Sequence, residues 1–159
     1  MKSYNILFLC THNSARSIIG EALASTHPSG KFKGFSAGST PGTSVNSIAA
    51  DIAAELGMDR TLLKSKSWDV YGQPDAPKMD FVITVCDNAA GEQCPFWPGQ
   101  PATAHWGFPD PSQVQGTDLE KRRAFNDVMN GLKRRLDIMA AMSLDKLDSM
   151  SLKEIHTKA

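Results

Sequence analysis

A cysteine and an arginine lie six positions apart near the start of the chain, in surroundings suited to binding an oxyanion. Cys10 directly follows the apolar segment 4–9, which predicts a buried strand, and a helical pattern begins at Ser17. A short loop between a strand end and a helix start directs backbone N–H groups toward one point, where a tetrahedral anion can bind. The same field favours a thiolate, so Cys10 is expected to ionise below its ordinary pKa of about 8.5 and to act as a nucleophile.

Arg16 is the expected side-chain partner of the anion. Its planar guanidinium matches two oxygens of an oxyanion, whereas a lysine would offer only a point charge. Asn13 tolerates the left-handed backbone conformation that a tight anion loop needs. The alternative is a buried cysteine at a strand end beside a surface arginine. The predicted oxyanion-binding residues are Thr11, His12, Asn13, Ser14, Ala15, Arg16 and Ser17.

Asp110 is a candidate proton donor, because displacing an oxygen leaving group requires one. Prolines flank it on both sides, and Trp106 and Phe108 precede it. We expect partial desolvation, which would keep its proton bound above a pH of about 4. An Asp-Pro pair is also typical of a simple turn.

Length and composition limit the possible classes. A chain of 159 residues with 41% hydrophobic content indicates one domain with a sizeable core. The 17 basic residues match 17 acidic ones, so neither nucleic acid nor an anionic membrane is an expected partner. No apolar run approaches the ~20 residues of a membrane span, and no signal-peptide pattern precedes the first strand, which predicts a cytoplasmic protein. Three cysteines favour reactive thiols over a disulfide framework.

Strand-like and helical segments alternate, which predicts a single α/β domain with a mostly parallel four-stranded sheet flanked by helices. The catalytic domain is expected at 1–142, with 143–159 as a short helical tail packed on it. Because ligands gather at the carboxyl ends of parallel strands, Cys10 and Cys86 are expected at the same edge. Two basic clusters, 121–123 and 133–135, are expected to be solvated helix faces, with a docking surface as the alternative. The predicted strands are 4–9, 31–37, 79–85 and 103–106, and the predicted helices are 17–26, 45–56 and 118–142.

Several segments resemble the low-molecular-weight protein tyrosine phosphatases, and more closely the arsenate reductases built on the same fold. The resemblance runs from Tyr4 to about Arg135. It implies that Cys10 is the nucleophile, that Arg16 binds the oxyanion and that Asp110 is the general acid. Its marks are the 10–17 loop, Ser36-Ala37-Gly38, Thr84-Val85-Cys86, Cys94-Pro95 and the run from His105 to Pro111.

Two features favour the reductase over the phosphatase. Reduction requires two electrons, so thiols must pair, and Cys86 and Cys94 supply further thiols. Residues 112–115, Ser-Gln-Val-Gln, stand where the phosphatases place tyrosines that grip an aryl group. The alternative is a phosphatase that hydrolyses aryl phosphates through a Cys10 phosphoenzyme.

The resemblance implies a relay of disulfides. Cys10 attacks arsenic while Asp110 protonates the departing oxygen, Cys86 then attacks Cys10 with release of arsenite, and Cys94 attacks Cys86. A thiol reductant, thioredoxin or glutathione with glutaredoxin, would reset the enzyme, and phosphate would compete with arsenate. The length of segment 87–93 and Ala15 depart from the thioredoxin-linked pattern, which leaves the reductant open.

Two kinds of metal site are also conceivable. The resemblance implies a potassium site in some members of the family, although each of its ligands could serve instead as a loop hydrogen-bonder. The matching residues are Asn13, Glu21, Ser36 and Asp69. A metal-binding module using Cys86, Cys94 and His105 is less favoured, because zinc ligands usually pair within two to four residues.

Overall fold

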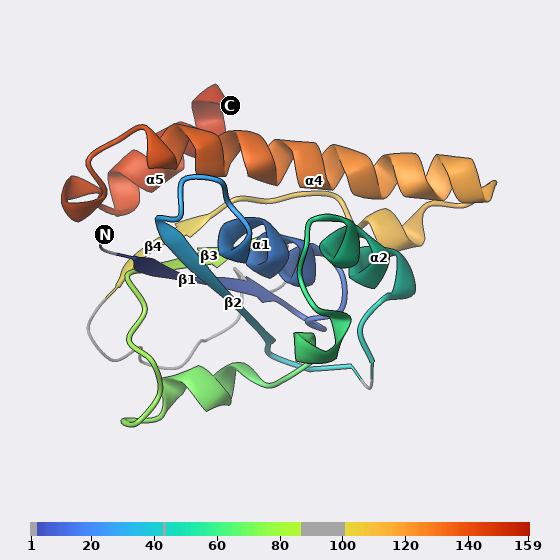
Figure 1. Cartoon of the computed structure of the whole chain (residues 1–159), viewed down its shortest axis with the longest axis horizontal. Coiled ribbons are helices and arrows are strands. Elements are labelled where there is room, and N and C mark those ends of the chain that lie inside the picture. The colour runs from blue at the N-terminus through green and yellow to red at the C-terminus, as the bar shows by residue number, and fades with distance from the viewer. Residues whose placement is uncertain (1–2, 43, 87–100) are drawn as a thin grey trace.

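The computed structural model describes residues 3–42, 44–86 and 101–159, which form one parallel sheet with helices packed on it (Figure 1). In these ranges the sheet has four strands in the order β2-β1-β3-β4. All three strand pairs are parallel, which confirms the predicted α/β fold class. The strands are β1 (Tyr4–Cys10), β2 (Phe32–Gly38), β3 (Phe81–Thr84) and β4 (Ala102–His105).

Helices cover one face of the sheet and a short 3-10 segment lies on the other (Figure 1). The helices α1, α2 and α4 are on the first face, and η2 is on the second. The α-helices are α1 (Arg16–Ser25), α2 (Ser47–Glu55), α4 (Asp118–Ala140) and α5 (Ser149–Lys158). The 3-10 helices are η1 (Arg60–Leu62), η2 (Trp68–Gly72), η3 (Pro111–Gln113) and η4 (Leu144–Lys146).

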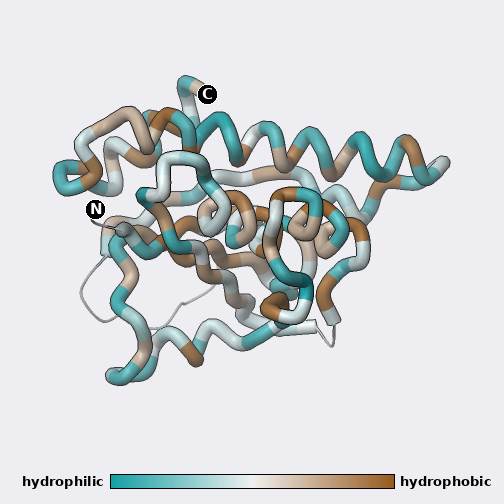
Figure 2. The backbone as a smooth tube through the Cα atoms, viewed as in Figure 1, coloured by the Kyte–Doolittle hydropathy of each residue, from teal (hydrophilic) through white to brown (hydrophobic). Residues whose placement is uncertain are grey.

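Strand β1 is buried on both faces, which explains its nearly continuous apolar sequence. Because side chains alternate along a strand, Phe8 and Cys10 join the core beneath the helices, whereas Leu9 joins a smaller core with Trp68 and Tyr71 of η2. Figure 2 shows the same pattern, with apolar colour concentrated in the sheet and α1 and polar colour recurring along α4. The alternation therefore fixes the face from which the Cys10 side chain emerges.

The carboxyl ends of the strands meet at one edge. Cys10 is the last residue of β1 and is in register with Gly38, the last residue of β2. Leu9 is in register with Thr84, which ends β3 two residues before Cys86. The prediction that Cys10 and Cys86 lie at the same edge is therefore confirmed.

Helix α4 and the tail close the helical face. Thr117 and Glu120 form a reciprocal capping box at the start of α4. Residues 143–159, predicted as a helical tail, form η4 and α5, and Leu152 and Ile155 of α5 are buried in the main core. Figure 1 places α5 beside the carboxyl-terminal half of α4 and next to β4.

None of the helices in the described ranges combines the length and the apolar character needed to cross a membrane.

Candidate active site

The predicted anion loop connects the end of β1 to the start of α1. Asn13 adopts a φ of 50°, the left-handed conformation that the sequence predicted. Ala15 occupies the N-cap of α1 and offers no polar side chain, so the first N–H groups of the helix stay available to an anion. Gly38 packs under the loop, since a Cβ there would lie 2.5 Å from the Thr11 carbonyl oxygen.

The carbonyl groups of the loop are engaged on its outer side. Successive carbonyls accept hydrogen bonds from residues behind the loop, and these bonds turn the intervening N–H groups toward the concave side. The bonds run from Thr40 N to Thr11 O (2.8 Å), from Gly42 N to His12 O (2.9 Å), from Ser65 Oγ to Asn13 O (2.7 Å) and from Asn46 N to Ser14 O (2.8 Å). The loop is thereby shaped as an anion cradle by protein contacts alone.

Asn13 ties the cradle to the neighbouring segments through its side chain, which is fully buried. Its Nδ2 donates to Ser17 Oγ at 2.9 Å, and its Oδ1 accepts from the backbone N–H of Lys66 at 2.9 Å. Asn13 is therefore a structural residue of the loop, and its side chain is committed to these two bonds.

Cys10 and Cys86 are in direct contact. Both are buried free thiols, and a hydrogen bond joins their side chains. Cys86 Sγ also accepts from the backbone N–H of Thr11 at 3.3 Å and lies 3.5 Å from Thr11 Oγ1. Two sulfurs in contact are what a thiol–disulfide exchange requires.

The prediction of a lowered pKa for Cys10 is wrong for this arrangement. The hydrogen bond to Cys86 and burial raise the pKa of the Cys10 thiol far above its ordinary value, and Arg16 and the Thr11 N–H only partly offset them. Negative charge on Cys86 also opposes ionisation of Cys10. The prediction treated Cys10 as a lone thiol, whereas a second sulfur lies beside it and the ionisation of the two thiols is coupled.

Arg16 lies between the anion loop and the loop that carries Asp110. Its Nη1 donates to the Phe108 carbonyl at 2.7 Å, and its Nη2 lies 3.7 Å from Asp110 Oδ2. The Arg16 side chain is 14% exposed, so the charge is largely enclosed. The two loops predicted to carry the chemistry thus meet at this guanidinium.

Asp110 also performs the turn role that was the alternative to catalysis. Its Oδ1 accepts from Ser112 N–H at 2.9 Å and from Ser112 Oγ at 2.6 Å, which caps η3. Burial raises the pKa of Asp110, but the bonds from Ser112, the charge of Arg16 and a bond from Gln113 outweigh it, so the pKa lies below its ordinary value. The expectation of a retained proton is therefore wrong here.

Two of the four predicted potassium ligands are hydrogen-bonded to each other, and a lysine lies beside them. Ser36 Oγ donates to Glu21 Oε1, and Lys66 Nζ lies 3.9 Å from the same oxygen. Burial raises the pKa of Glu21, while the Ser36 bond and the Lys66 charge lower it in part. Asn13 is bound to the backbone of Lys66. The fourth residue, Asp69, is exposed at the start of η2.

Other candidates stand as follows. Cys94 lies outside the described residues. His12 is exposed, with its Nδ1 3.1 Å from the Thr40 carbonyl. His105 Nδ1 lies 2.8 Å from Thr84 Oγ1. Within the ranges described, no group of three or more His, Cys, Asp or Glu residues is placed to hold a metal ion.

The sequence missed Lys66, Ser112 and the carbonyl group of Phe108. Backbone carbonyls carry no residue signature, so the Phe108 contact could not be read from the sequence. Ser112 follows Asp110 at the spacing of an Asx turn, which is a usable signal. Lys66 had no signal, since its partner Glu21 is remote in the sequence.

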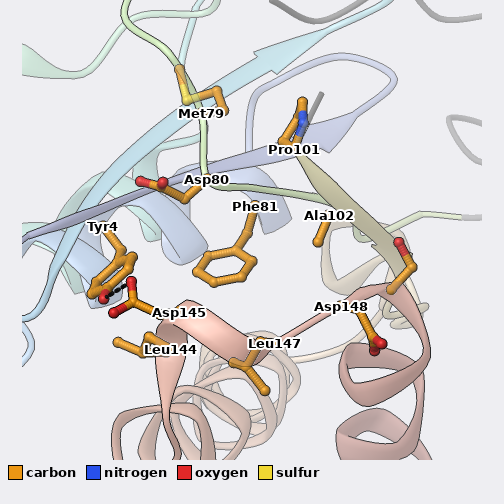
Figure 3. Close-up of a pocket in the computed structure, with 11 residues that line it drawn as sticks. Tyr4, Met79, Asp80, Phe81, Pro101, Ala102, Leu144, Asp145, Leu147 and Asp148 are labelled. Carbon is orange, nitrogen blue, oxygen red and sulfur yellow. Dashed lines mark hydrogen bonds between the residues drawn. The ribbon is translucent and has the colours of Figure 1, made fainter. Parts of the chain in front are cut away.

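A cavity of about 490 Å³ lies at the opposite, amino-terminal end of the strands (Figure 3). Its carboxylates are used in packing the chain. Asp80 Oδ2 accepts from Asn5 N–H at 2.8 Å, Asp145 Oδ1 accepts from Tyr4 Oη at 2.6 Å, and Asp148 caps α5. These bonds hold the tail against this end of the sheet, whereas Cys10 and Cys86 lie at the opposite edge.

Known proteins of similar sequence and fold include arsenate reductases. An arsenate reductase from Halalkalibacterium halodurans is 34% identical over 135 residues, which are 85% of this chain and 94% of that protein. A solved arsenate reductase in a phosphate-binding state shares 27% identity and a TM-score of 0.63, over 89% of this chain and 98% of that one. A thioredoxin-dependent arsenate reductase from Corynebacterium glutamicum, at 22% identity and a TM-score of 0.60 over 88% of this chain and 63% of that one, shares the fold. Residues 5–150 match the low molecular weight phosphotyrosine protein phosphatase family, to which this chain therefore belongs.

Proposed function

We propose that this protein is an arsenate reductase, which converts arsenate to arsenite by thiol chemistry. The observation that carries the proposal is the contact between Cys10 and Cys86 at an anion cradle. A phosphatase needs only the first thiol, whereas a reductase needs a second thiol in reach of the first. The relatives named arsenate reductase support the same assignment.

Arsenate binds in the cradle through the N–H groups of residues 11–16 and the Arg16 guanidinium. Because Cys86 now accepts the Thr11 N–H, the entering anion displaces this sulfur. The displacement removes the hydrogen bond that most strongly raises the pKa of Cys10. Cys10 then ionises, and its proton passes to the bound oxyanion.

The first chemical step joins Cys10 to the substrate. The Cys10 thiolate attacks arsenic(V), an S–As bond forms, and one arsenate oxygen departs as water. Asp110 delivers a proton to that oxygen. The resting carboxylate takes up this proton when the anion is bound, because the negative charge of arsenate opposes its own charge and competes for Arg16, and both effects raise its pKa.

The second step transfers the electrons. The Cys86 thiol gives its proton to an oxygen on arsenic, and the resulting thiolate attacks Cys10 Sγ. An S–S bond forms, the S–As bond breaks, and its electron pair stays on arsenic, which leaves as arsenite. Cys94 then attacks Cys86 and frees Cys10, leaving a Cys86–Cys94 disulfide. The role of Cys94 rests on the sequence.

An external thiol reductant returns the enzyme to its starting state with two electrons and two protons. We assign this role to thioredoxin, with glutathione and glutaredoxin as the second candidate, because the structural relatives include a thioredoxin-dependent enzyme. Phosphate acts as a competitor, since it has the shape and charge of arsenate.

A monovalent cation at Glu21 is an optional part of this function. Lys66 already brings an ammonium group to within 3.9 Å of that carboxylate. A potassium ion held by Asn13, Glu21, Ser36 and Asp69 would have to share this carboxylate with the lysine.

A single pulse of arsenate tests the assignment. Wild-type protein should release about one arsenite per enzyme and form a disulfide that includes Cys86, as shown by mass spectrometry of alkylated peptides. Cys94→Ser should stop at a Cys10–Cys86 disulfide, and Cys86→Ser should stop with arsenic attached to Cys10. Aryl phosphate hydrolysis that survives in both variants, without arsenate-dependent disulfides, would favour the phosphatase.

A further inference from the structure

Helix α5 lies next to β4 (Figure 1). Its residues contact β4 and the first part of the loop that leads from β4 to Asp110. The contacts advance together along the two segments, from the start of β4 to the active-site edge. They are Thr103 N–H to Ser149 Oγ (3.0 Å), Trp106 Nε1–H to the Leu152 carbonyl (2.9 Å) and the Phe108 ring against the His156 ring (centroids 6.1 Å apart). The last contact reaches the residue whose carbonyl binds Arg16.

Arg135 of α4 also packs against Phe108. We call the site formed around this ring by Arg135, His156 and Gly131 the Phe108 seat. The sequence predicted a solvated residue in a basic cluster, but the side chain is buried. Its guanidinium carbon lies 4.8 Å from the centre of the Phe108 ring, and its Nε donates to His156 Nδ1 at 2.9 Å. Its Nη1 donates to the Gly131 carbonyl at 2.7 Å. The Phe108 ring thus touches a cation and the edge of an imidazole.

The Phe108 seat also depends on the absence of a side chain at Gly131. A Cβ on Gly131 of α4 would lie 2.6 Å from Phe108 Cε1, so the ring approaches the helix closely only because this position is glycine. At the other end of Phe108, its backbone carbonyl oxygen accepts from Arg16 Nη1 at 2.7 Å. Phe108 thus connects the His156 and Arg135 side chains to the Arg16 guanidinium, and Asp110 follows two residues later.

We propose that α5 acts as a brace for the loop that carries Phe108 and Asp110. His156 of α5 and Arg135 of α4 are positioning residues for Arg16 and Asp110. The inference rests on the proposed function for its catalytic readout. The family match ends at residue 150, so His156 lies beyond it. Covering the core would require only the apolar Leu152 and Ile155. Burying a guanidinium is costly unless its donors are satisfied, and here His156 supplies an acceptor.

Three variants of the full chain test the brace. His156→Leu removes the acceptor and the ring, His156→Asn keeps an acceptor near the position of Nδ1, and Glu154→Ala changes an exposed residue of the same helix as the control. The readouts are the single-turnover rate of arsenate-dependent disulfide formation, the dissociation constant of phosphate by calorimetry, and the Tm. A misplacement of about 1 Å can cost up to ~10²-fold in rate. We expect His156→Leu to slow the step by roughly 10-fold, His156→Asn to recover most of this loss, and Glu154→Ala to match wild type.

A double-mutant cycle separates positioning from general destabilisation. In an Asp110→Asn background the acid no longer contributes, so adding His156→Leu should lower the rate by a smaller factor than it does in wild type. Equal factors in the two backgrounds, together with an unchanged phosphate affinity, would overturn the brace. If His156→Leu does not fold, Arg135→Lys, which keeps the charge but loses the guanidinium fork, replaces it in the same cycle.

The two proposals fail in different ways. If wild-type protein releases no arsenite from arsenate, the proposed function is wrong, but the phosphate affinities of the His156 variants still decide whether the brace positions Arg16. If wild-type protein reduces arsenate and both His156 variants match it in rate and in phosphate affinity, the brace alone is wrong.

Discussion

The backbone N–H of Thr11 lies 3.3 Å from the sulfur of Cys86, although the two residues are 75 positions apart in the sequence. In the reduced protein, a donor of the anion cradle is therefore occupied by a thiol. The same sulfur raises the pKa of Cys10 through a hydrogen bond. Cys86 thus has two effects in the resting protein, one on oxyanion binding and one on the nucleophile.

Removing Cys86 should therefore make Cys10 easier to ionise. In Cys86→Ala the largest cause of the raised pKa is gone, while Arg16 and the Thr11 N–H still stabilise the thiolate. The pH dependence of the iodoacetamide reaction at Cys10 measures the change, with Cys94→Ser as the matched control. We expect the midpoint of the Cys86→Ala profile to lie at lower pH than that of the control. An unchanged midpoint would show that Cys86 does not control the pKa of Cys10.

Asp110→Asn should bind phosphate but react slowly. The amide retains an acceptor for Ser112 and so keeps the η3 cap, yet it has no proton to give to the departing oxygen. General acids contribute ~10²–10⁴-fold, and we expect a loss of that size in the rate of arsenite release. Phosphate affinity should equal or exceed that of wild type, because a charge that repels the anion is gone. A variant as fast as wild type from pH 5 to 8 would place the acid elsewhere.

Lys66→Met should create a response to potassium. The change leaves the buried Glu21 carboxylate with Ser36 as its polar partner, and breaking a buried pair typically costs about 3 kcal/mol. Without the lysine charge, the pKa of Glu21 rises further above its ordinary value of 4.5, so the folded state binds more protons than the unfolded state above that pH. Stability of the variant should therefore fall as pH rises through this window.

The measurement is the Tm of wild type and Lys66→Met in sodium and potassium buffers, with Lys64→Met as a control on a neighbouring exposed lysine. Potassium should raise the Tm of Lys66→Met more than that of wild type. Equal potassium-induced shifts in Tm for the two proteins would show that Lys66 does not take the place of a cation at Glu21.

Wild-type stability should fall on mild acidification through His156. Burial and the charges of Arg135 and His105 lower its pKa below 6.5, so just below pH 6.5 the unfolded chain binds more protons than the folded one. Stability therefore decreases as pH falls through this window. The difference in Tm between pH 7.5 and 5.5 should be larger for wild type than for His156→Asn. Equal differences would show that this imidazole does not titrate with folding.

Local features of the site were predictable from the sequence, whereas contacts between distant segments were not. The turn at Asn13 and the start of α4 at Asp118 depend on neighbouring residues, and the structure confirms both. The shared edge of Cys10 and Cys86 followed from the rule for parallel strands. The pKa of Cys10 did not follow, because it depends on which sulfur accepts its hydrogen bond.

Charge patterns in the sequence were misleading at two positions. Arg135 stands in a basic run that is typical of a solvated face, yet its side chain is buried against Phe108. Asp110 was expected to be kept protonated by apolar neighbours, but Ser112 two residues later stabilises its charge. In both cases specific neighbours decide the outcome, through hydrogen bonds or ring contacts that average burial does not reveal.

The outward carbonyl bonds of the anion loop have a thermodynamic consequence. Because Thr40, Gly42, Asn46 and Ser65 hold the loop in its binding shape, arsenate does not have to order it. Fixing the backbone of one residue costs about 1–2 kcal/mol of free energy. Because the loop is already ordered, this cost is not subtracted from the free energy of ligand binding. Under the proposed function, the fold itself therefore favours the binding of a small oxyanion, and the thiols at the site determine the reaction that follows.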